Sequence, residues 1–272
     1  MEPRALWYTA PGAARIAPAA PGAGEVLVET ALTALSRGTE RLVFAGRVPE
    51  GEHARMRAPF QEGDFPFPVK YGYSAVGRVV EGPAPLEGRD VFALHPHQDR
   101  FRLPVGAVIP LPPDVPARRA VLAANMETAL NAVWDADPAP GTRVAVLGAG
   151  VVGALTAYLL KRLGGCDTLL ADKLEARGRI ADELGVSFAC AASLRAAAPF
   201  QIIVNATASP AALADGLDAL GFEGRLIELS WYGEGTVPVP LGGAFHANRL
   251  TIRASQVGHV APARRASTSH RD

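Results

Sequence analysis

The spacing of hydrophobic residues changes along the chain. From residue 143 onward, short apolar runs alternate with segments whose apolar residues recur with the roughly 3.6-residue period of a helix. The runs predict strands and the periodic segments predict helices. Apolar strands that alternate with helices are typical of a parallel sheet wrapped by helices. The predicted strands are 143–148, 168–172, 201–207, 224–231 and 249–258, and the predicted helices are 116–136, 151–165, 173–185 and 209–221.

The region before residue 117 lacks this alternation of strand-like and helix-like segments and is rich in proline. Of the 23 prolines, 16 precede Ala117, and proline interrupts both helices and central strands. The stretches 25–32, 74–82 and 89–94 are therefore predicted strands of a small, irregular β-rich domain. The predicted division is a β-rich domain over 1–116, an α/β domain over 117–260, and a disordered or truncated tail over 261–272.

Composition narrows the class of protein. The formal net charge is zero, so electrostatics gives no reason to expect a nucleic acid or an anionic membrane as partner. No apolar run approaches the roughly 18 residues of a membrane span, and the first residues lack the apolar core of a signal peptide. Two cysteines, Cys166 and Cys190, form no disulfide framework. A reducing cytoplasm is the expected location.

A glycine motif, GAGVVG at 148–153, joins the strand predicted at 143–148 to the helix predicted at 151–165. Strand, glycine turn and helix in this order form the dinucleotide-binding fingerprint. Gly148 permits the tight turn, Gly150 lets a pyrophosphate approach the backbone, and Gly153 allows the helix to pack closely on the strand. The helix start at Val151 and Val152 offers N–H groups to the anion. The alternative is a glycine-rich turn in an α/β domain that binds no nucleotide.

Asp172 ends the next predicted strand, about twenty residues after the motif, where the fingerprint carries an acidic residue. Its carboxylate is expected to accept hydrogen bonds from the adenosine ribose. A negative charge there repels a 2′-phosphate, so NAD is the predicted cofactor in preference to NADP. Arg177 follows five residues later and is predicted to reach the same ribose.

The layout resembles the medium-chain dehydrogenase/reductase superfamily, the alcohol-dehydrogenase-like proteins. SRGTERLVFAG at 36–46 corresponds to its C-G-T-D loop, YGYSAVGRVVEG at 71–82 to its G-H-E-x-x-G-x-V segment, and ANMETAL at 124–130 to the segment with the last metal ligand. The resemblance implies a GroES-like β-rich domain followed by a Rossmann domain with a doubly wound parallel sheet, an α/β fold. GTERLVFAGRVP and GYSAVGRVVE are most similar to a zinc-lacking branch that includes the bacteriochlorophyllide hydroxyethyl dehydrogenases.

The chain departs from the superfamily at the metal ligands. Arg37 stands at the position of the first zinc-binding cysteine, Tyr73 at that of the histidine and Ala124 at that of the last ligand, while Ser74 replaces the adjacent glutamate. Zinc requires thiolate, imidazole or carboxylate donors, and a guanidinium has no lone pair to offer. No metal is therefore predicted at these positions.

The resemblance also implies catalytic roles. Hydride transfer requires stabilisation of charge on the substrate oxygen and movement of a proton. Arg37 and Tyr73 are predicted to replace zinc in the first task, Thr39 to relay the proton, and Glu40 to orient Arg37 or accept the proton. Around the cofactor, the expected contacts are Thr128 with the nicotinamide, and Thr207 and Ser230 at the strand ends. The alternatives are an internal Arg37–Glu40 ion pair, a packed Tyr73 and a turn residue at Thr39.

Together these residues predict an NAD-dependent, zinc-independent oxidoreductase that acts on an alcohol or a carbonyl compound. Two alternatives stay open: a non-catalytic nucleotide-binding remnant, and a zinc enzyme with relocated ligands that include His95 and His97. We interpret these two histidines as loop and strand-edge residues that can line a substrate cleft. The chain is expected to be truncated at its C-terminus relative to the superfamily, and a homodimer is left open.

Overall fold

The structure is a computed structural model that describes residues 2–269. It divides into two compact units, Met1–Ala124 and Asn125–Asp272. Of the predicted tail 261–272, residues 270–272 lie outside the described part. At the start of that segment, Ala261 is buried and its N–H donates to Asn131 Oδ1 at 2.8 Å.

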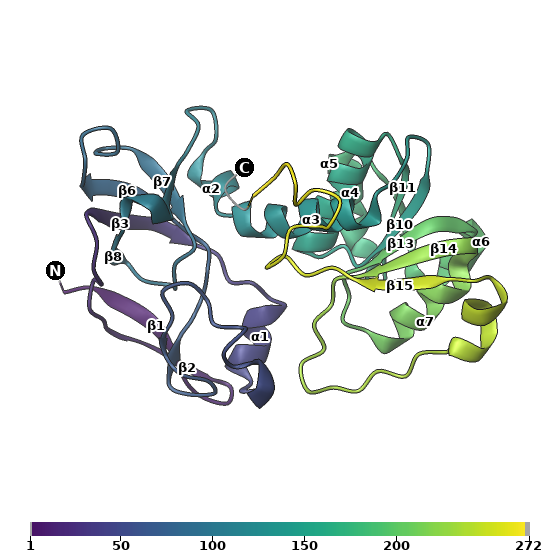
Figure 1. Cartoon of the computed structure of the whole chain (residues 1–272), viewed down its shortest axis with the longest axis horizontal. Coiled ribbons are helices and arrows are strands. Elements are labelled where there is room, and N and C mark those ends of the chain that lie inside the picture. Colours follow the sequence, from purple (N-terminus) through teal and green to yellow (C-terminus); the bar gives the residue numbers. More distant parts are fainter. Residues whose placement is uncertain (1, 270–272) are drawn as a thin grey trace. The chain divides into compact units, whose positions relative to one another are not determined.

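Two antiparallel sheets build the first unit (Figure 1). One contains β3 (Val26–Thr33), β6 (Ala75–Glu81), β7 (Asp90–Ala93), β8 (Arg100–Leu103) and β9 (Val108–Pro110). The other contains β1 (Arg4–Ala10), β2 (Ala13–Pro18), β4 (Glu62–Gly63) and β5 (Val69–Lys70). Their strand orders are β8-β3-β6-β7-β9 and β2-β1-β5-β4. The short helices are α1 (Thr39–Phe44), α2 (Ala117–Ala120), η1 (Glu50–Glu52) and η2 (Val105–Ala107).

The five-stranded sheet of this unit is buried on both faces at its centre. Ala75 of β6 packs with Val26 and Val28 of β3, whereas the next residue, Val76, packs with Phe92 and with the segment 117–124. This alternation is the period of a strand. The strands predicted at 25–32, 74–82 and 89–94 are confirmed as β3, β6 and β7.

The second unit is a six-stranded sheet whose paired strands are all parallel. Its strands are β10 (Arg143–Leu147), β11 (Asp167–Asp172), β12 (Ser187–Cys190), β13 (Phe200–Asn205), β14 (Leu220–Glu228) and β15 (Thr251–Ala254). The order is β12-β11-β10-β13-β14-β15. This is the doubly wound order that the Rossmann prediction requires.

Helices cover both faces of this sheet, as Figure 1 shows. They are α3 (Ala123–Ala136), α4 (Val151–Gly164), α5 (Gly178–Leu184), α6 (Leu194–Ala197) and α7 (Pro210–Ala219), with short turns η3 (Glu175–Arg177), η4 (Ala191–Ser193) and η5 (Leu241–Phe245). Along β10, Val144 and Val146 face the core shared with α3, α4 and α5. Ala145 and Leu147 face the core shared with α6 and α7. Each fully buried Val or Leu contributes about 1.5–3 kcal/mol.

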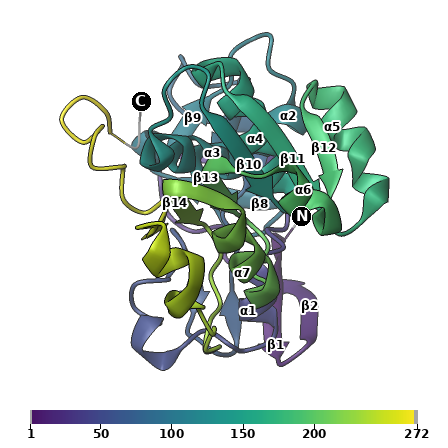
Figure 2. The same cartoon turned by 90° about the vertical axis from the view of Figure 1, so that its right-hand side faces the viewer.

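Two predicted helices are shorter than expected. The helix predicted at 116–136 is interrupted by a turn at Val121 and Leu122, where the Val121 carbonyl accepts a hydrogen bond from the Ser74 hydroxyl. The helix predicted at 173–185 begins as η3 and becomes α-helical only at Gly178. A Cβ added at Gly178 would lie 3.2 Å from the Phe188 ring of β12, so the helix packs closely on this strand. Figure 2 shows α5 beside β12. None of the helices in the described part of the chain is long and apolar enough to span a membrane.

Candidate functional site

The glycine loop leaves β10 and turns directly into α4. Gly148 has a φ of +98°, and an added Cβ there would lie 3.0 Å from Thr207 Cγ2. A Cβ on Gly153 would lie 1.9 Å from the carbonyl oxygen of Gly148. Such an overlap with backbone cannot be relieved by moving a side chain. Gly148 is therefore required by its positive φ, and Gly153 by its close packing against the Gly148 carbonyl.

The N-terminus of α4 is open to an anion. Gly150 is its N-cap, with no side-chain hydrogen bond to the first turn, and nothing lies within 4 Å of an added Cβ there. Val151 is 50% exposed and Val152 is half-buried. The first turn of a helix presents N–H groups and a partial positive charge. The loop therefore fits the pyrophosphate of a dinucleotide.

Asp172, at the carboxyl end of β11, is bonded to this loop. Its Oδ2 accepts hydrogen bonds from the Ala149 N–H and from Arg177 Nη1, both at 2.8 Å, and its Oδ1 accepts the Leu174 N–H at 2.9 Å. Burial alone would raise the pKa of Asp172, but the two amides and the Arg177 charge together lower it below its ordinary value. The structure thus holds an ionised carboxylate beside the glycine turn.

Thr207 and Ser230 lie on two neighbouring loops of the same unit. Asn205 Oδ1 accepts from Thr207 Oγ1 at 2.7 Å, while Ser230 Oγ accepts the Ala208 N–H at 2.9 Å. Both loops begin at carboxyl ends of strands, β13 and β14, and β13 pairs with β10. Thr207 also lies against Gly148, as the close approach above shows, so the structure brings this residue to the glycine loop. Thr128 is half-buried on α3.

Sequence reasoning missed a polar cluster behind these loops. Asn205 is fully buried, and its Nδ2 donates to Glu228 Oε2 at 2.7 Å. Tyr232 donates to the same oxygen at 3.2 Å, and burial together with the Glu228 charge raises the pKa of Tyr232 to about 12. The sequence does carry a signal for this cluster, because Asn205 and Glu228 are polar residues at the ends of two apolar strands.

In the first unit, Glu40 does not have the partner predicted for it. The carboxylate is 3% exposed; Oε2 accepts from Tyr8 at 2.8 Å and lies 2.7 Å from His97 Nε2, and Oε1 accepts the Ser36 N–H at 2.6 Å. Arg37 is exposed and forms no ion pair with any described residue. The expected Arg37–Glu40 interaction is therefore wrong, because the Ser36 amide, Tyr8 and His97 hold the carboxylate in a buried position while Arg37 is exposed.

Tyr73 lies among hydroxyl groups. The Ser36 and Thr39 hydroxyls act on the pKa of its phenol, and its ring meets Tyr71 edge-on at 6.0 Å between centroids. Burial raises the pKa of Tyr73, the two hydroxyls lower it, and the negative charge of Glu40 raises it; the balance is a raised pKa. The structure thus brings Thr39, Glu40 and Tyr73 together and leaves Arg37 at the surface.

The residues predicted to replace the last metal ligand and the glutamate beside the histidine ligand are structural. Ser74 is buried with its hydroxyl on the Val121 carbonyl, and Ala124 packs in the core with Val76 and Phe92. No three His, Cys, Asp or Glu side chains within the described residues gather as a metal site.

His95 and His97 are both buried, which contradicts the interpretation that they line a cleft. The His95 ring stacks on Phe101 at 3.8 Å between centroids, and burial lowers the pKa of His95 to about 4. The His97 ring instead meets Glu40. The two rings have different partners because the chain between them is an irregular segment, not a strand.

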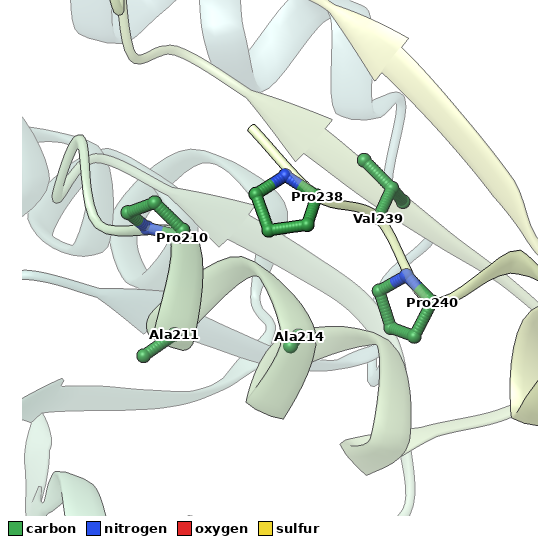
Figure 3. Close-up of a pocket in the computed structure, with 6 residues that line it drawn as sticks. All are labelled: Pro210, Ala211, Ala214, Pro238, Val239 and Pro240. Atoms are coloured by element: carbon green, nitrogen blue, oxygen red, sulfur yellow. The ribbon is translucent and has the colours of Figure 1, made fainter. Parts of the chain in front are cut away.

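An apolar groove of about 380 Å³ lies elsewhere in the second unit (Figure 3). It is lined by Pro210, Ala211 and Ala214 of α7 and by Pro238, Val239 and Pro240. These side chains have no acid, base or nucleophile, so the groove supplies no chemistry.

No protein-family model matches the chain. Solved structures do. An alcohol dehydrogenase from Escherichia coli CFT073, solved with NADH, is 16% identical with a TM-score of 0.74, over 94% of this chain and 84% of that one. The chain therefore has the same fold as this alcohol dehydrogenase.

Two further structures agree with this fold. A zinc-dependent alcohol dehydrogenase from Streptococcus pneumonia has a TM-score of 0.76 at 16% identity, covering 94% of this chain and 83% of that one. A quinone oxidoreductase from Thermus thermophilus, solved alone and with NADPH, has a TM-score of 0.71 at 21% identity, covering 93% and 80%. At these identities the similarity establishes the fold; the predicted GroES-like and Rossmann architecture is confirmed.

Proposed function

We propose that this protein is a nicotinamide-dependent oxidoreductase that transfers a hydride between NAD and an alcohol or carbonyl substrate. The observation that carries the proposal is the bond between Asp172 and the Ala149 N–H, which holds an acidic strand end against an open glycine turn. This arrangement fits the ribose and pyrophosphate of a dinucleotide. In the division of labour that we infer, the second unit holds the cofactor and the first supplies the substrate-binding side chains.

NAD is preferred to NADP in this proposal because of the charge on Asp172. A carboxylate has about four acceptor positions, and three donors already occupy Asp172. One position is left for a ribose hydroxyl, whereas a 2′-phosphate would meet a negative charge. Arg177, bonded to the same carboxylate, is the side chain that could turn to a phosphate.

The proposed chemistry uses no zinc. Arg37, Tyr73 and Ala124 stand at the ligand positions of the superfamily, and none is a zinc donor. When bound, the nicotinamide supplies the acceptor or donor of the hydride. The Tyr73 hydroxyl, whose pKa is lowered by the Ser36 and Thr39 hydroxyls and raised overall by burial, donates a hydrogen bond to the substrate oxygen and so stabilises its developing charge. Arg37, at the surface of the same segment, adds positive charge, and Glu40 accepts the proton.

One sample tests the proposal. Purified protein is titrated with NADH by fluorescence, its metal content is measured, and turnover is followed over a panel of alcohols with NAD and of carbonyl compounds with NADH. Binding and turnover without stoichiometric metal are the expected result. NADH binding without turnover over the panel would favour a non-catalytic nucleotide-binding protein, and turnover that depends on bound zinc would favour relocated ligands.

A further inference from the structure

A side-chain pair joins the ends of two strands beside the glycine loop. Asn205 ends β13 and is fully buried, and Glu228 ends β14. Asn205 is paired in register both with Leu147, the last residue of β10, and with Glu228. Its Nδ2 donates to Glu228 Oε2 at 2.7 Å. The pair therefore lies at the level where β10 ends and the glycine loop begins at Gly148.

Asn205 holds the loop that follows β13. Its Oδ1 accepts hydrogen bonds from the Thr207 N–H at 3.2 Å and from Thr207 Oγ1 at 2.7 Å. Thr207 Oγ1 in turn accepts the Ser209 N–H at 3.0 Å. The single hydroxyl proton of Thr207 is thus used toward Asn205, and its Cγ2 methyl group lies 3.0 Å from a Cβ added at Gly148. Through these bonds Asn205 fixes the side chain that packs against the glycine loop.

Glu228 holds the loop that follows β14. Its Oε1 accepts the Ser230 N–H at 2.7 Å, and its Oε2 accepts the Tyr232 hydroxyl at 3.2 Å. Burial and the Glu228 charge raise the pKa of Tyr232 to about 12, so the phenol keeps its proton and can donate it to this bond. Ser230 Oγ accepts the Ala208 N–H of the neighbouring loop at 2.9 Å. The two loops are thus joined twice, at their base by the side-chain pair and further out by Ser230.

Ala208 has an unusual backbone conformation within these contacts. Its φ is +53°, in the left-handed region that residues other than glycine rarely adopt. Such conformations persist only where surrounding contacts hold them, and they cluster at ligand-binding and active sites. The Ser230 hydroxyl, which accepts the Ala208 N–H, supplies one of these contacts. The bonds around the loop therefore hold a shape that its own sequence disfavours.

The two loops lie on the opposite side of β10 from Asp172. The strand order is β12-β11-β10-β13-β14-β15, with Asp172 at the end of β11 and the loops at the ends of β13 and β14. In the proposed function the adenosine ribose binds at Asp172 and the pyrophosphate at the glycine loop after β10. The nicotinamide half must then extend to the other side of β10, toward Thr207 and Ser230.

We propose that Asn205 and Glu228 are positioning residues for the nicotinamide half of the cofactor, which they control through the two loops that they hold. This rests on the proposed function. Asn205 is fully buried, so it acts on the cofactor only through Thr207. Position 228 requires a carboxylate because three donors point at it: a side-chain amide, a backbone N–H and a phenol. The oxygens of an ionised carboxylate only accept.

Glu228→Gln tests this role with a side chain of nearly the same shape. A glutamine amide has one oxygen, so it can accept from Asn205 or from the Ser230 N–H, and its NH₂ group then faces the other donor. The double variant Asn205→Asp, Glu228→Gln reverses the direction of the pair's bond at unchanged net charge. Thr207 and Ser230 both keep their acceptors in it. Glu223→Gln, the same change at an exposed position of β14, is the matched control.

The measurement compares NADH with ADP, which carries the adenosine and the pyrophosphate but lacks the nicotinamide half. Isothermal titration calorimetry gives both dissociation constants. In Glu228→Gln the NADH affinity should fall by roughly tenfold, the effect of about one misplaced hydrogen bond, while the ADP affinity stays within about twofold of the wild type. The double variant should recover the wild-type NADH affinity, and Glu223→Gln should retain both affinities. A role in folding alone would lower the two affinities together.

The possible results separate this inference from the proposed function. An equal fall for both ligands in Glu228→Gln, or no fall for NADH, would overturn the positioning role and leave the oxidoreductase standing. If Glu228→Gln does not fold, Tyr232→Phe carries the same comparison, because it removes only one of the three donors. Its NADH affinity should fall by a smaller factor at unchanged ADP affinity, and an unchanged NADH affinity would again overturn the role. A wild type that does not bind NADH would refute the proposed cofactor, and this inference with it.

Discussion

The carboxylate of Asp172 accepts a hydrogen bond from the backbone N–H of Ala149 at 2.8 Å. This bond ties the end of β11 to the middle of the glycine loop, two elements that a dinucleotide would contact through different groups. The acid that we propose to bind the ribose and the turn that we propose to bind the pyrophosphate are thus one structural unit.

Asp172→Asn should weaken cofactor discrimination. The variant loses the charge that repels a 2′-phosphate and frees Arg177 from its ion pair. We expect the ratio of NADH to NADPH affinity to fall by about tenfold or more, which corresponds to about 1.4 kcal/mol. Fluorescence titrations with both cofactors measure it. Asp182→Asn, an exposed acid on α5, is the control, and an unchanged ratio in Asp172→Asn would contradict the assigned role.

Two alanine substitutions in the glycine loop should affect different properties, one the stability of the fold and the other the affinity for NADH. Gly153→Ala meets the Gly148 carbonyl and should lower the free energy of unfolding by about 3 kcal/mol. Gly150→Ala has open space around it, so its stability should be near that of the wild type, whereas NADH affinity should fall because the methyl group occupies the approach to the backbone. Denaturant unfolding and NADH titration of both variants give the comparison. Full NADH affinity in a folded Gly150→Ala would argue against the loop as the pyrophosphate site.

Gly72→Ala should disrupt the Glu40–His97 pair without removing either residue. The added methyl would overlap the His97 ring and sit at a positive φ. The expected loss of stability is about 1–3 kcal/mol, and the histidine NMR signal of His97 should shift. Gly88→Ala is the control: its backbone also has a positive φ, but an added Cβ meets nothing within 4 Å. Its loss of stability therefore reports the backbone strain alone, without a steric overlap.

Burial of His95 should make stability depend on pH. Its pKa falls from 6.5 to about 4 in the folded chain, so the unfolded chain binds more protons between these values. The stabilisation is present above pH 6.5 and is lost as the pH falls toward 4, to a total of about 3 kcal/mol. His95→Phe, which can retain the stack on Phe101, should flatten this part of the curve in urea unfolding measured at a series of pH values. An equally steep curve in the variant would show that another group is responsible.

Much of the fold is readable from the sequence because it follows from local periodicity. The strands β10, β11 and β13 are apolar runs, β14 ends in one, and the strand–turn–helix around Gly148 is a local pattern. Strand β12 is different: its four residues are partly exposed at the edge of the sheet, so no apolar run marks it.

The site is harder to read because its contacts are distant in sequence. Glu40 and His97 are 57 positions apart, and no spacing rule joins them. The nearer pairing of Glu40 with Arg37 was the reasonable prediction, and it is wrong because the Ser36 amide, Tyr8 and His97 together offer the carboxylate a buried position. Local sequence indicates which residues are present in a segment, whereas the tertiary fold decides which way each one turns.

The bond from the Ser74 hydroxyl to the Val121 carbonyl limits how this site can be redesigned. Glutamate at position 74 would place a charge in a core that now closes around a small hydroxyl, and a larger ligand at Ala124 would press on Val76 and Phe92. Cysteine and histidine at positions 37 and 73 alone would give two donors, while the rest of the coordination sphere stays filled by packed side chains. Installing zinc ligands at these positions would thus lower the free energy of unfolding before a complete metal site could form, because positions 74 and 124 are packed for small side chains.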